Sequence, residues 1–134
     1  MSTPAIGRFS TTAALRAGIS VTLAISGLIH AELYVHGYRH VPTIGFAFLA
    51  QASVFVALAI LIAVGGPSWL HWAVGLGALG SLMAFASSRT IGIFGFVEHG
   101  WEPAPQAVVS VIAEVLTVVL GAAAVLTARV ARPV

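Results

Sequence analysis

The sequence predicts an all-α membrane protein, with four transmembrane helices in an antiparallel bundle joined by short loops. The 134-residue chain is 59% hydrophobic, with a mean hydropathy of +1.03. Only 7% of its residues are charged, whereas the surface of a soluble domain needs about a quarter. It also contains four apolar stretches, each close to the roughly 20 residues that cross a bilayer. We therefore expect residues 1–134 to form one integral membrane domain.

The first helix is predicted at about residues 13–34. A polar arm, residues 1–12, precedes it and is expected to fray. The apolar run is too long for the core of a secretory signal peptide, and Ile29 occupies a position where cleavage after Ala31 would need a small residue. We therefore expect this helix to remain in the mature protein.

The second helix is predicted at about residues 44–64, because the Gly-Gly-Pro sequence at 65–67 ends the apolar run. The third is predicted at about residues 68–89, with Ser68 as its N-cap. Two Trp and one His lie near its start, and such amphipathic rings favour the membrane interface.

The fourth helix is predicted at about residues 105–126. Before it lies an apolar segment, residues 91–97, that is far too short to span a bilayer. We expect this segment to be an interfacial or re-entrant piece, or an overhang of the third helix.

Arginine positions predict the topology. Four spans place both termini on one side of the membrane, and most of the arginines lie near the termini. These are Arg8, Arg16, Arg129 and Arg132. The positive-inside rule then predicts a multi-pass cell-membrane protein with cytoplasmic termini. The connections at 30–43 and 89–102 would face the extracytoplasmic side.

Several kinds of chemistry are excluded by composition. The chain has no Cys and no Asp, which excludes disulfides, thiolate metal sites, Cys nucleophiles and a Ser-His-Asp triad. Its six basic residues are spread out, so no nucleic-acid partner is expected. Gly75, Gly77 and Gly80 match a GxGxxG pattern, but they lie inside a predicted helix and indicate packing. The residues do not identify an enzyme.

Three polar residues are predicted to form a column that descends into the bundle. Gln51 would lie roughly 12 Å and Glu114 roughly 14 Å below the outer edge, at about 1.5 Å per helical residue. His30 would lie about one helical turn below that edge. An ionisable residue at the depth of Glu114 is costly and is therefore a functional-site hypothesis, although a protonated Glu that only locks the helices is the alternative. We expect His30, Gln51 and Glu114 to form a ligand or proton site.

A second candidate site is a belt of charged and imidazole side chains in the outer connections. The outer belt comprises Glu32, His36, Arg39, His40, Arg89, Glu98, His99 and Glu102. Its His and Glu residues are ligand types that zinc accepts, but they show no fixed metal-binding spacing. An ordinary polar belt at the membrane surface is the alternative to a metal site. A haem held by His30 and His71 is disfavoured because the two lie at opposite faces.

Several sequence strings resemble known membrane proteins. GYRHVPTIG, FLAQ and FGFVEHGWEPAPQAVVSVIAE resemble a group of small actinobacterial four-helix integral membrane proteins without assigned chemistry. The order Arg16, Gly18, Gly27, His30, Pro42 and Gly45 is more loosely similar to DoxX-like membrane proteins. The DoxX-like resemblance implies a four-helix bundle and a redox or quinone-related setting, and it implies no catalytic residue.

Two functions follow as expectations. The first is an accessory or structural subunit that binds a larger membrane assembly or a second copy of itself through the outer belt and the lipid-facing helices. The alternative is a small-molecule, quinone, metal or ion site for binding or transport, built on His30, Gln51 and Glu114 in the outer half of the bundle. The sequence identifies no cofactor, and the lipid bilayer is the one partner that composition implies.

Overall fold

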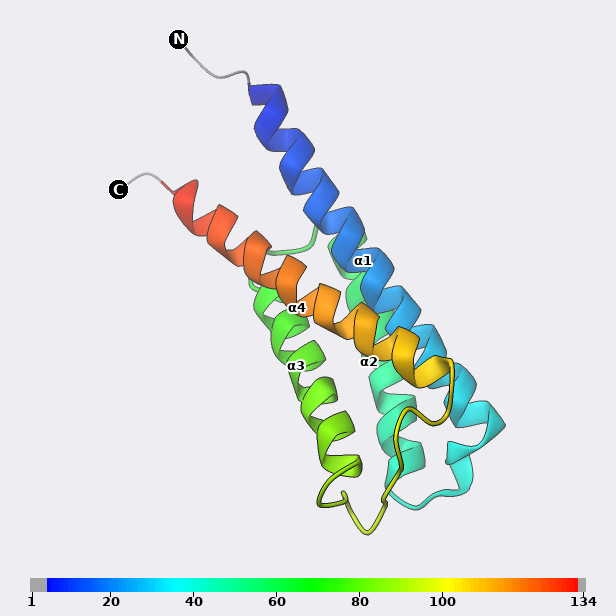
Figure 1. Ribbon diagram of the computed structural model, residues 1–134. Helices are drawn as coiled ribbons and strands as arrows, with labels where there is room; N and C mark the ends of the chain where they lie inside the picture. Colours follow the sequence, from blue (N-terminus) through cyan, green and yellow to red (C-terminus); the bar gives the residue numbers. More distant parts are fainter. Residues whose placement is uncertain (1–4, 133–134) are drawn as a thin grey trace.

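The computed structural model describes residues 5–132, with side chains from residue 11 onward, and these residues form an all-helical bundle (Figure 1). The helices are α1 (Ala5–His36), α2 (Ile44–Ala63), α3 (Leu70–Ser88) and α4 (Gln106–Val130), and a short 3₁₀ turn, η1 (Tyr38–His40), follows α1. All four α-helices are long and apolar enough to cross a membrane. The predicted class, an antiparallel four-helix membrane bundle, is therefore confirmed.

Several helix ends differ from the sequence prediction: α4 continues to Val130 rather than ending at about residue 126, and the starts of α1 and α3 also differ. Helix α1 begins at Ala5, so the predicted fraying of residues 5–12 is wrong, whereas residues 1–4 and the side chain of Arg8 lie outside the described part. The one glycine in this segment, Gly7, costs only about 1 kcal/mol relative to Ala in a helix. The N-cap of α3 is Trp69 without a side-chain cap bond, so the predicted capping by Ser68 is wrong.

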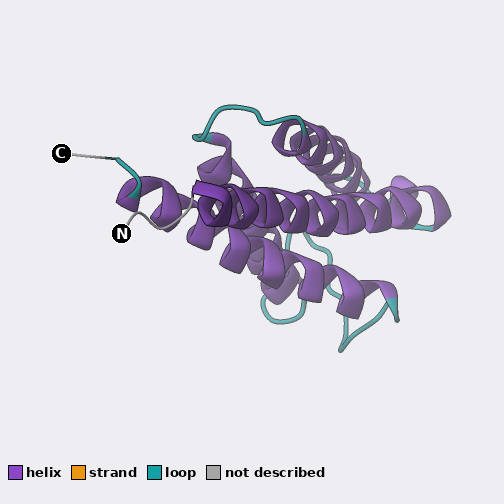
Figure 2. Cartoon of the chain, turned by 90° about the horizontal axis from the view of Figure 1, so that it is seen from above, coloured by secondary structure: helices purple, strands orange, loops and turns teal. Residues whose placement is uncertain are grey.

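The helices do not contact one another equally. Helix α1 packs extensively against α2 and α4, and α3 packs mainly against α4. Helices α2 and α3 are consecutive in sequence, yet they have little direct contact along their length. The termini lie at one end of the bundle, and residues 37–43 and 89–105 form the opposite end, here called the loop end (Figures 1 and 2).

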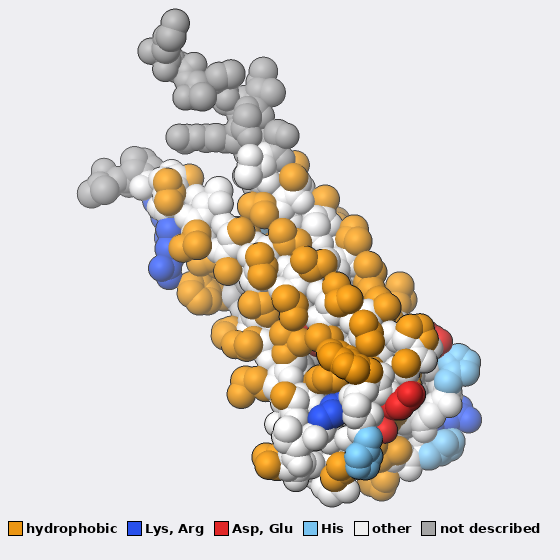
Figure 3. Space-filling view, viewed as in Figure 1, with side chains coloured by type: hydrophobic (Ala, Val, Ile, Leu, Met, Phe, Trp, Pro, Cys, Tyr) orange, Lys and Arg blue, Asp and Glu red, His pale blue; other side chains and the backbone are white. Residues whose placement is uncertain are grey.

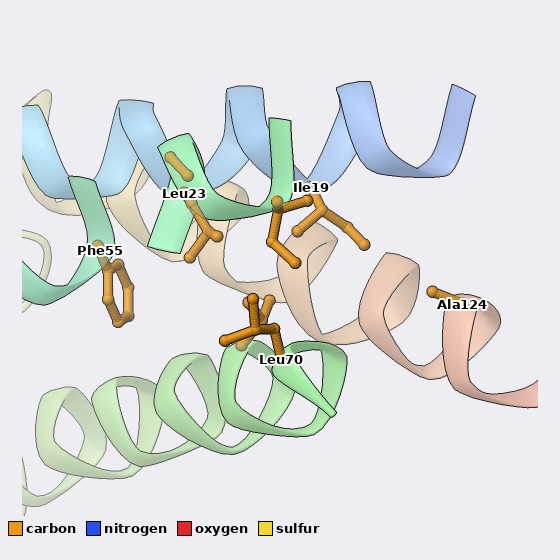
Figure 4. Packing of buried hydrophobic residues seen from close by; sticks show 8 residues of the cluster. Ile19, Leu23, Phe55, Leu70 and Ala124 are labelled. Atoms are coloured by element: carbon orange, nitrogen blue, oxygen red, sulfur yellow. The ribbon is translucent and has the colours of Figure 1, made fainter. Parts of the chain in front are cut away.

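The apolar core lies in the half of the bundle nearer the termini. Ile19 and Leu23 of α1 are fully buried, and they meet Phe55 of α2, Leu70 of α3 and Ala124 of α4 (Figure 4). Packing of this kind fixes the helices on one another, because in lipid the hydrophobic drive between helices is absent and close van der Waals contact replaces it.

Small and hydroxyl residues mark where the helices approach closely. A four-residue step in the sequence predicts inward faces formed by Gly18, Thr22, Ser26, His30 and Tyr34 on α1 and by Ala113, Thr117 and Gly121 on α4. Of these, Thr22, Ser26, His30, Ala113, Thr117 and Gly121 are buried. The Thr117 hydroxyl donates to the Thr22 hydroxyl at 2.7 Å and so links α4 to α1.

On α2 the same four-residue step predicts an inward face formed by Ala47, Gln51, Phe55, Ala59 and Ala63, and this prediction is only partly right. Phe55 and Ala59 are buried, but Ala47 and Ala63 are exposed. A four-residue step turns about 40° around a helix axis, so five residues in such a row drift away from a single face.

The outside of the bundle is apolar along the helices and polar at the ends. Large apolar side chains such as Leu28, Phe46 and Met83 are more than half exposed along the helices. Histidine, Glu and Arg side chains gather at the loop end, and basic side chains lie near the termini (Figure 3). This distribution fits a multi-pass membrane protein.

Residues 91–97 form a tight loop rather than an extension of α3, which ends at Ser88. The Ile93 and Phe96 backbones exchange hydrogen bonds of 2.8 and 2.9 Å, and Gly95, at the centre of this turn with φ +77°, permits the sharp reversal. The Glu98 amide donates to the Ser88 carbonyl at 2.9 Å, which folds the loop back over the end of α3. The alternative that residues 91–97 are an overhang of the third helix is therefore wrong. These residues fold over the end of the bundle opposite the termini.

Candidate functional site

Glu114 is the centre of the candidate site, because side chains from all four helices donate hydrogen bonds to it. It is only 2% exposed. Its Oε1 accepts from Ser26 of α1 at 2.8 Å, from Gln51 of α2 at 3.1 Å and from Ser81 of α3 at 2.8 Å. Ser110, one turn earlier on α4, donates at 3.1 Å. All four donors address Oε1, so the second oxygen of the carboxyl group, Oε2, is left without a bond from any side chain in the described part of the chain.

The two other residues of the predicted column belong to the same cluster. The Gln51 amide nitrogen donates to Ser81 at 2.6 Å as well as to Glu114, so both of its hydrogens are used. His30 does not bond Glu114 directly. Its Nδ1 lies 2.8 Å from the Ser26 carbonyl, which can only accept, so Nδ1 carries a proton. In its neutral form, His30 then presents Nε2 as an acceptor.

Three polar atoms of this cluster have no protein partner. In the described part of the chain, no hydrogen bond reaches Oε2 of Glu114, Oε1 of Gln51 or Nε2 of His30. No buried side-chain nitrogen or oxygen there is enclosed without a partner, so each of the three atoms retains access to open space.

That space is a cavity of about 130 Å³ in the loop-end half of the bundle. Its polar end is lined by the Glu114 cluster. The remaining wall is largely apolar and includes Leu33, Ile44, Ala47, Phe48, Ala84, Phe85, Ile93, Phe94, Phe96, Ala107 and Val111. An engineered apolar cavity of about 150 Å³ holds benzene, so this volume suits a group of about one ring.

One wall of the cavity is a series of four rings, here called the aromatic wall: His30, Phe48, Tyr38 and Phe96. Phe48 lies 5.0 Å from His30 and is stacked on Tyr38 at 4.5 Å between ring centroids. Phe96, from the loop at 91–97, meets the edge of Tyr38 at 5.7 Å. The wall runs from the Glu114 cluster to the covering loop and gives the cavity an aromatic side.

Arg89 lines the opposite end of the cavity from Glu114. Its guanidinium lies 3.9 Å above the Phe85 ring and donates to the Ser88 hydroxyl at 2.6 Å and to the Gly100 and Glu102 carbonyls. Partial burial lowers the pKa of Arg89, and the nearby Glu98 opposes that shift. Arg89 thus anchors the loop and closes the mouth of the cavity.

Tyr38 ties the same mouth to the first connection. Its hydroxyl donates to the Glu98 carboxylate at 2.8 Å. Burial raises the pKa of Tyr38, and the bond to Glu98 raises it further. Of the predicted belt residues, Arg89 lines the cavity, and Glu98 is bonded to the cavity-lining Tyr38.

The rest of the outer belt does not converge on one site. His36 bonds the Glu32 backbone carbonyl at 2.9 Å, and Arg39 donates to His40 at 2.9 Å. Glu32 also accepts from Gln106 at 3.4 Å, whereas His99 and the Glu102 side chain are exposed. In residues 5–132 no three His or Glu side chains lie close enough to share a metal ion.

Sequence reasoning missed the three serines that bond Glu114. Ser26 was expected on the inward face of α1, but Ser81 and Ser110 were not assigned to the site. For Ser110 the sequence does carry a signal, because Ser110 lies four residues before Glu114 and therefore on the same face of α4. The contacts of Ser26 and Ser81 depend on how the helices pack.

No protein-family model matches this chain, and no curated protein or solved structure shows significant similarity to it.

Proposed function

We propose that this protein binds a small amphipathic molecule in the loop-end cavity. The polar group of the ligand lies at Glu114, Gln51 and His30, and its apolar body lies against the aromatic wall. The observation that carries this proposal is a buried carboxylate, bonded from all four helices, that keeps one oxygen open to a cavity.

A purely structural role explains less of this arrangement. A polar network that only locks helices together gains most when every polar atom is paired, because an unpaired buried group costs about 1–3 kcal/mol. Here three acceptors remain open beside an apolar space. Convergent polar groups at the end of an apolar, aromatic-lined pocket are the usual composition of a ligand site.

The chemistry of the cluster is binding rather than catalysis. The cluster holds a carboxylate, an amide, an imidazole and hydroxyls, but the Ser hydroxyls are used as donors to Glu114. We therefore assign no reaction. The accessory-subunit function, the cytoplasmic position of the termini and the resemblance to DoxX-like and small actinobacterial membrane proteins stay predictions.

Two matched variants test whether the cavity binds ligands. Ala84 lines the cavity, and Ala86 on the same helix does not. Ala84→Phe fills the space, whereas Ala86→Phe adds the same side chain elsewhere on α3. The assay is the stability of purified protein in mild detergent with one-ring compounds that carry different polar groups. A ligand at 100 times its Kd stabilises the folded state by about 2.7 kcal/mol.

We expect at least one such compound to stabilise the wild-type protein and Ala86→Phe, and to lose that effect in Ala84→Phe. If every compound acts equally on both variants, the cavity is not the binding site and the proposal is wrong.

A further inference from the structure

We infer that the polar group of the ligand is a protonated amine on an apolar, ring-sized body. This inference rests on the proposed function and names the ligand class of the same cavity. The observation behind it is that the open atoms at the polar end of the cavity are all hydrogen-bond acceptors, and one of them belongs to a carboxylate.

The hydrogens at this end of the cavity are already used inside the protein. Ser26, Ser81 and Ser110 each donate to Glu114. Gln51 donates its two amide hydrogens to Ser81 and Glu114, and His30 donates its Nδ1 hydrogen to the Ser26 carbonyl. A ligand that only accepts hydrogen bonds, such as a quinone carbonyl, therefore finds no free donor beside neutral His30.

The same geometry suits a donor. Oε2 of Glu114, Oε1 of Gln51 and Nε2 of His30 can each accept one hydrogen, and a primary ammonium group has three to donate. Such a ligand therefore carries one hydrogen for each open acceptor in the lining of the cavity.

Charge favours the same class. No Arg side chain is bonded to Glu114 in the described part of the chain, and its four donors are neutral. An ammonium ion supplies the missing opposite charge in a region of low dielectric, where the attraction is strong.

Arg89 does not oppose a cation at the polar end. Its guanidinium is held over Phe85 and bonded to Ser88 and to the loop carbonyls at the mouth of the cavity. Glu98, bonded by Tyr38, lies close enough to offset part of its charge.

Three one-ring probes of similar size separate the ligand classes: benzylamine, benzyl alcohol and 2-methyl-1,4-benzoquinone. The chain contains no Cys and its six basic residues are all Arg, so the quinone meets no thiol or lysine side chain with which to react. Dissociation constants are measured at neutral pH by calorimetry in mild detergent, for wild type, Ala84→Phe, Ala86→Phe and Glu114→Gln.

We expect benzylamine to bind the wild-type protein at least ten times more tightly than either neutral probe, in a manner that Ala84→Phe abolishes and Ala86→Phe does not. Glu114→Gln removes the charge, so we expect it to reduce the preference for benzylamine over benzyl alcohol to within about threefold. The wild-type ratio needs no variant and decides the inference even if Glu114→Gln does not fold.

The outcomes separate this inference from the proposed function. If benzyl alcohol or the quinone binds as tightly as benzylamine and Ala84→Phe abolishes that binding, the amine class is wrong and the cavity remains a ligand site. If no probe shows binding that depends on Ala84, the proposed function itself fails. A preference for benzylamine that persists unchanged in Glu114→Gln overturns the role assigned to the carboxylate.

Discussion

Replacing Glu114 by Gln or by Met separates its hydrogen bonds from its charge. Both substitutions remove the charge, but Gln keeps an oxygen that can accept from the surrounding hydroxyls, whereas Met has none. Four donors lie within 3.1 Å of Oε1. At an average of about 0.6 kcal/mol for a hydrogen bond between membrane helices, the acceptor contributes about 2.4 kcal/mol.

The wild-type carboxylate also has a cost. A charged residue at the centre of a membrane helix costs about 2.5–3.5 kcal/mol, which nearly cancels the gain from the four bonds. We therefore expect Glu114→Met, which loses both the bonds and the charge, to lie within about 1 kcal/mol of the wild type in its free energy of unfolding. Glu114→Gln, which loses only the charge, should be about 2 kcal/mol more stable than Glu114→Met. The measurement is reversible unfolding in mixed micelles titrated with SDS.

Two results would refute this reasoning. Equal stability of the Gln and Met variants would show that the hydroxyl network does not hold the helices together. A loss of more than about 2 kcal/mol in Glu114→Gln would show that the charge itself stabilises the bundle, which favours the packing role over a ligand site.

Three further predictions concern the loop end and the topology. A Cβ on Gly45 would lie 2.5 Å from the Tyr38 carbonyl, so Gly45→Ala should lower the unfolding temperature and weaken ligand binding, while Gly80→Ala, with open space around it, should do neither. The raised pKa of Tyr38 predicts that its phenol ionises above the ordinary value of 10.0. The hydrogen bond from Tyr38 to Glu98 should then contribute fully to stability below about pH 10, and it should be lost as the pH rises through the raised pKa. An ultraviolet titration should show one tyrosine that ionises above about pH 10 and that is absent in Tyr38→Phe. If every tyrosine ionises at the ordinary pH, this prediction is wrong. Because the termini are predicted to be cytoplasmic, a cysteine introduced at His99 should react with an impermeant maleimide in intact cells, and a cysteine at Ala131 should not. The reverse pattern would contradict the predicted topology.

The fold was largely predictable because its determinants are local. Stretches of apolar residues with lengths matched to a bilayer, together with the Gly-Gly-Pro break, placed the four helices, and Glu114 was identified from the cost of an ionisable group at that depth. These arguments need only sequence distance along one helix.

The composition of the site was less predictable because it depends on contacts between helices. Ser81 reaches Glu114 only because α3 packs on α4, and the aromatic wall exists only because the loop at 91–97 folds back to place Phe96 on Tyr38. The metal hypothesis for the outer belt relied on residue types without fixed spacing, and in the described residues those side chains lie apart.

The most direct test of the central claim is the carboxyl ¹³C signal of Glu114 in protein labelled at its four Glu residues. The signal that disappears in Glu114→Gln identifies Glu114. If the cavity binds its ligand through this carboxylate, the signal shifts as benzylamine is added to the wild-type protein and to Ala86→Phe, and stays fixed in Ala84→Phe. A Glu114 signal that does not move with benzylamine, benzyl alcohol or the quinone would contradict the account.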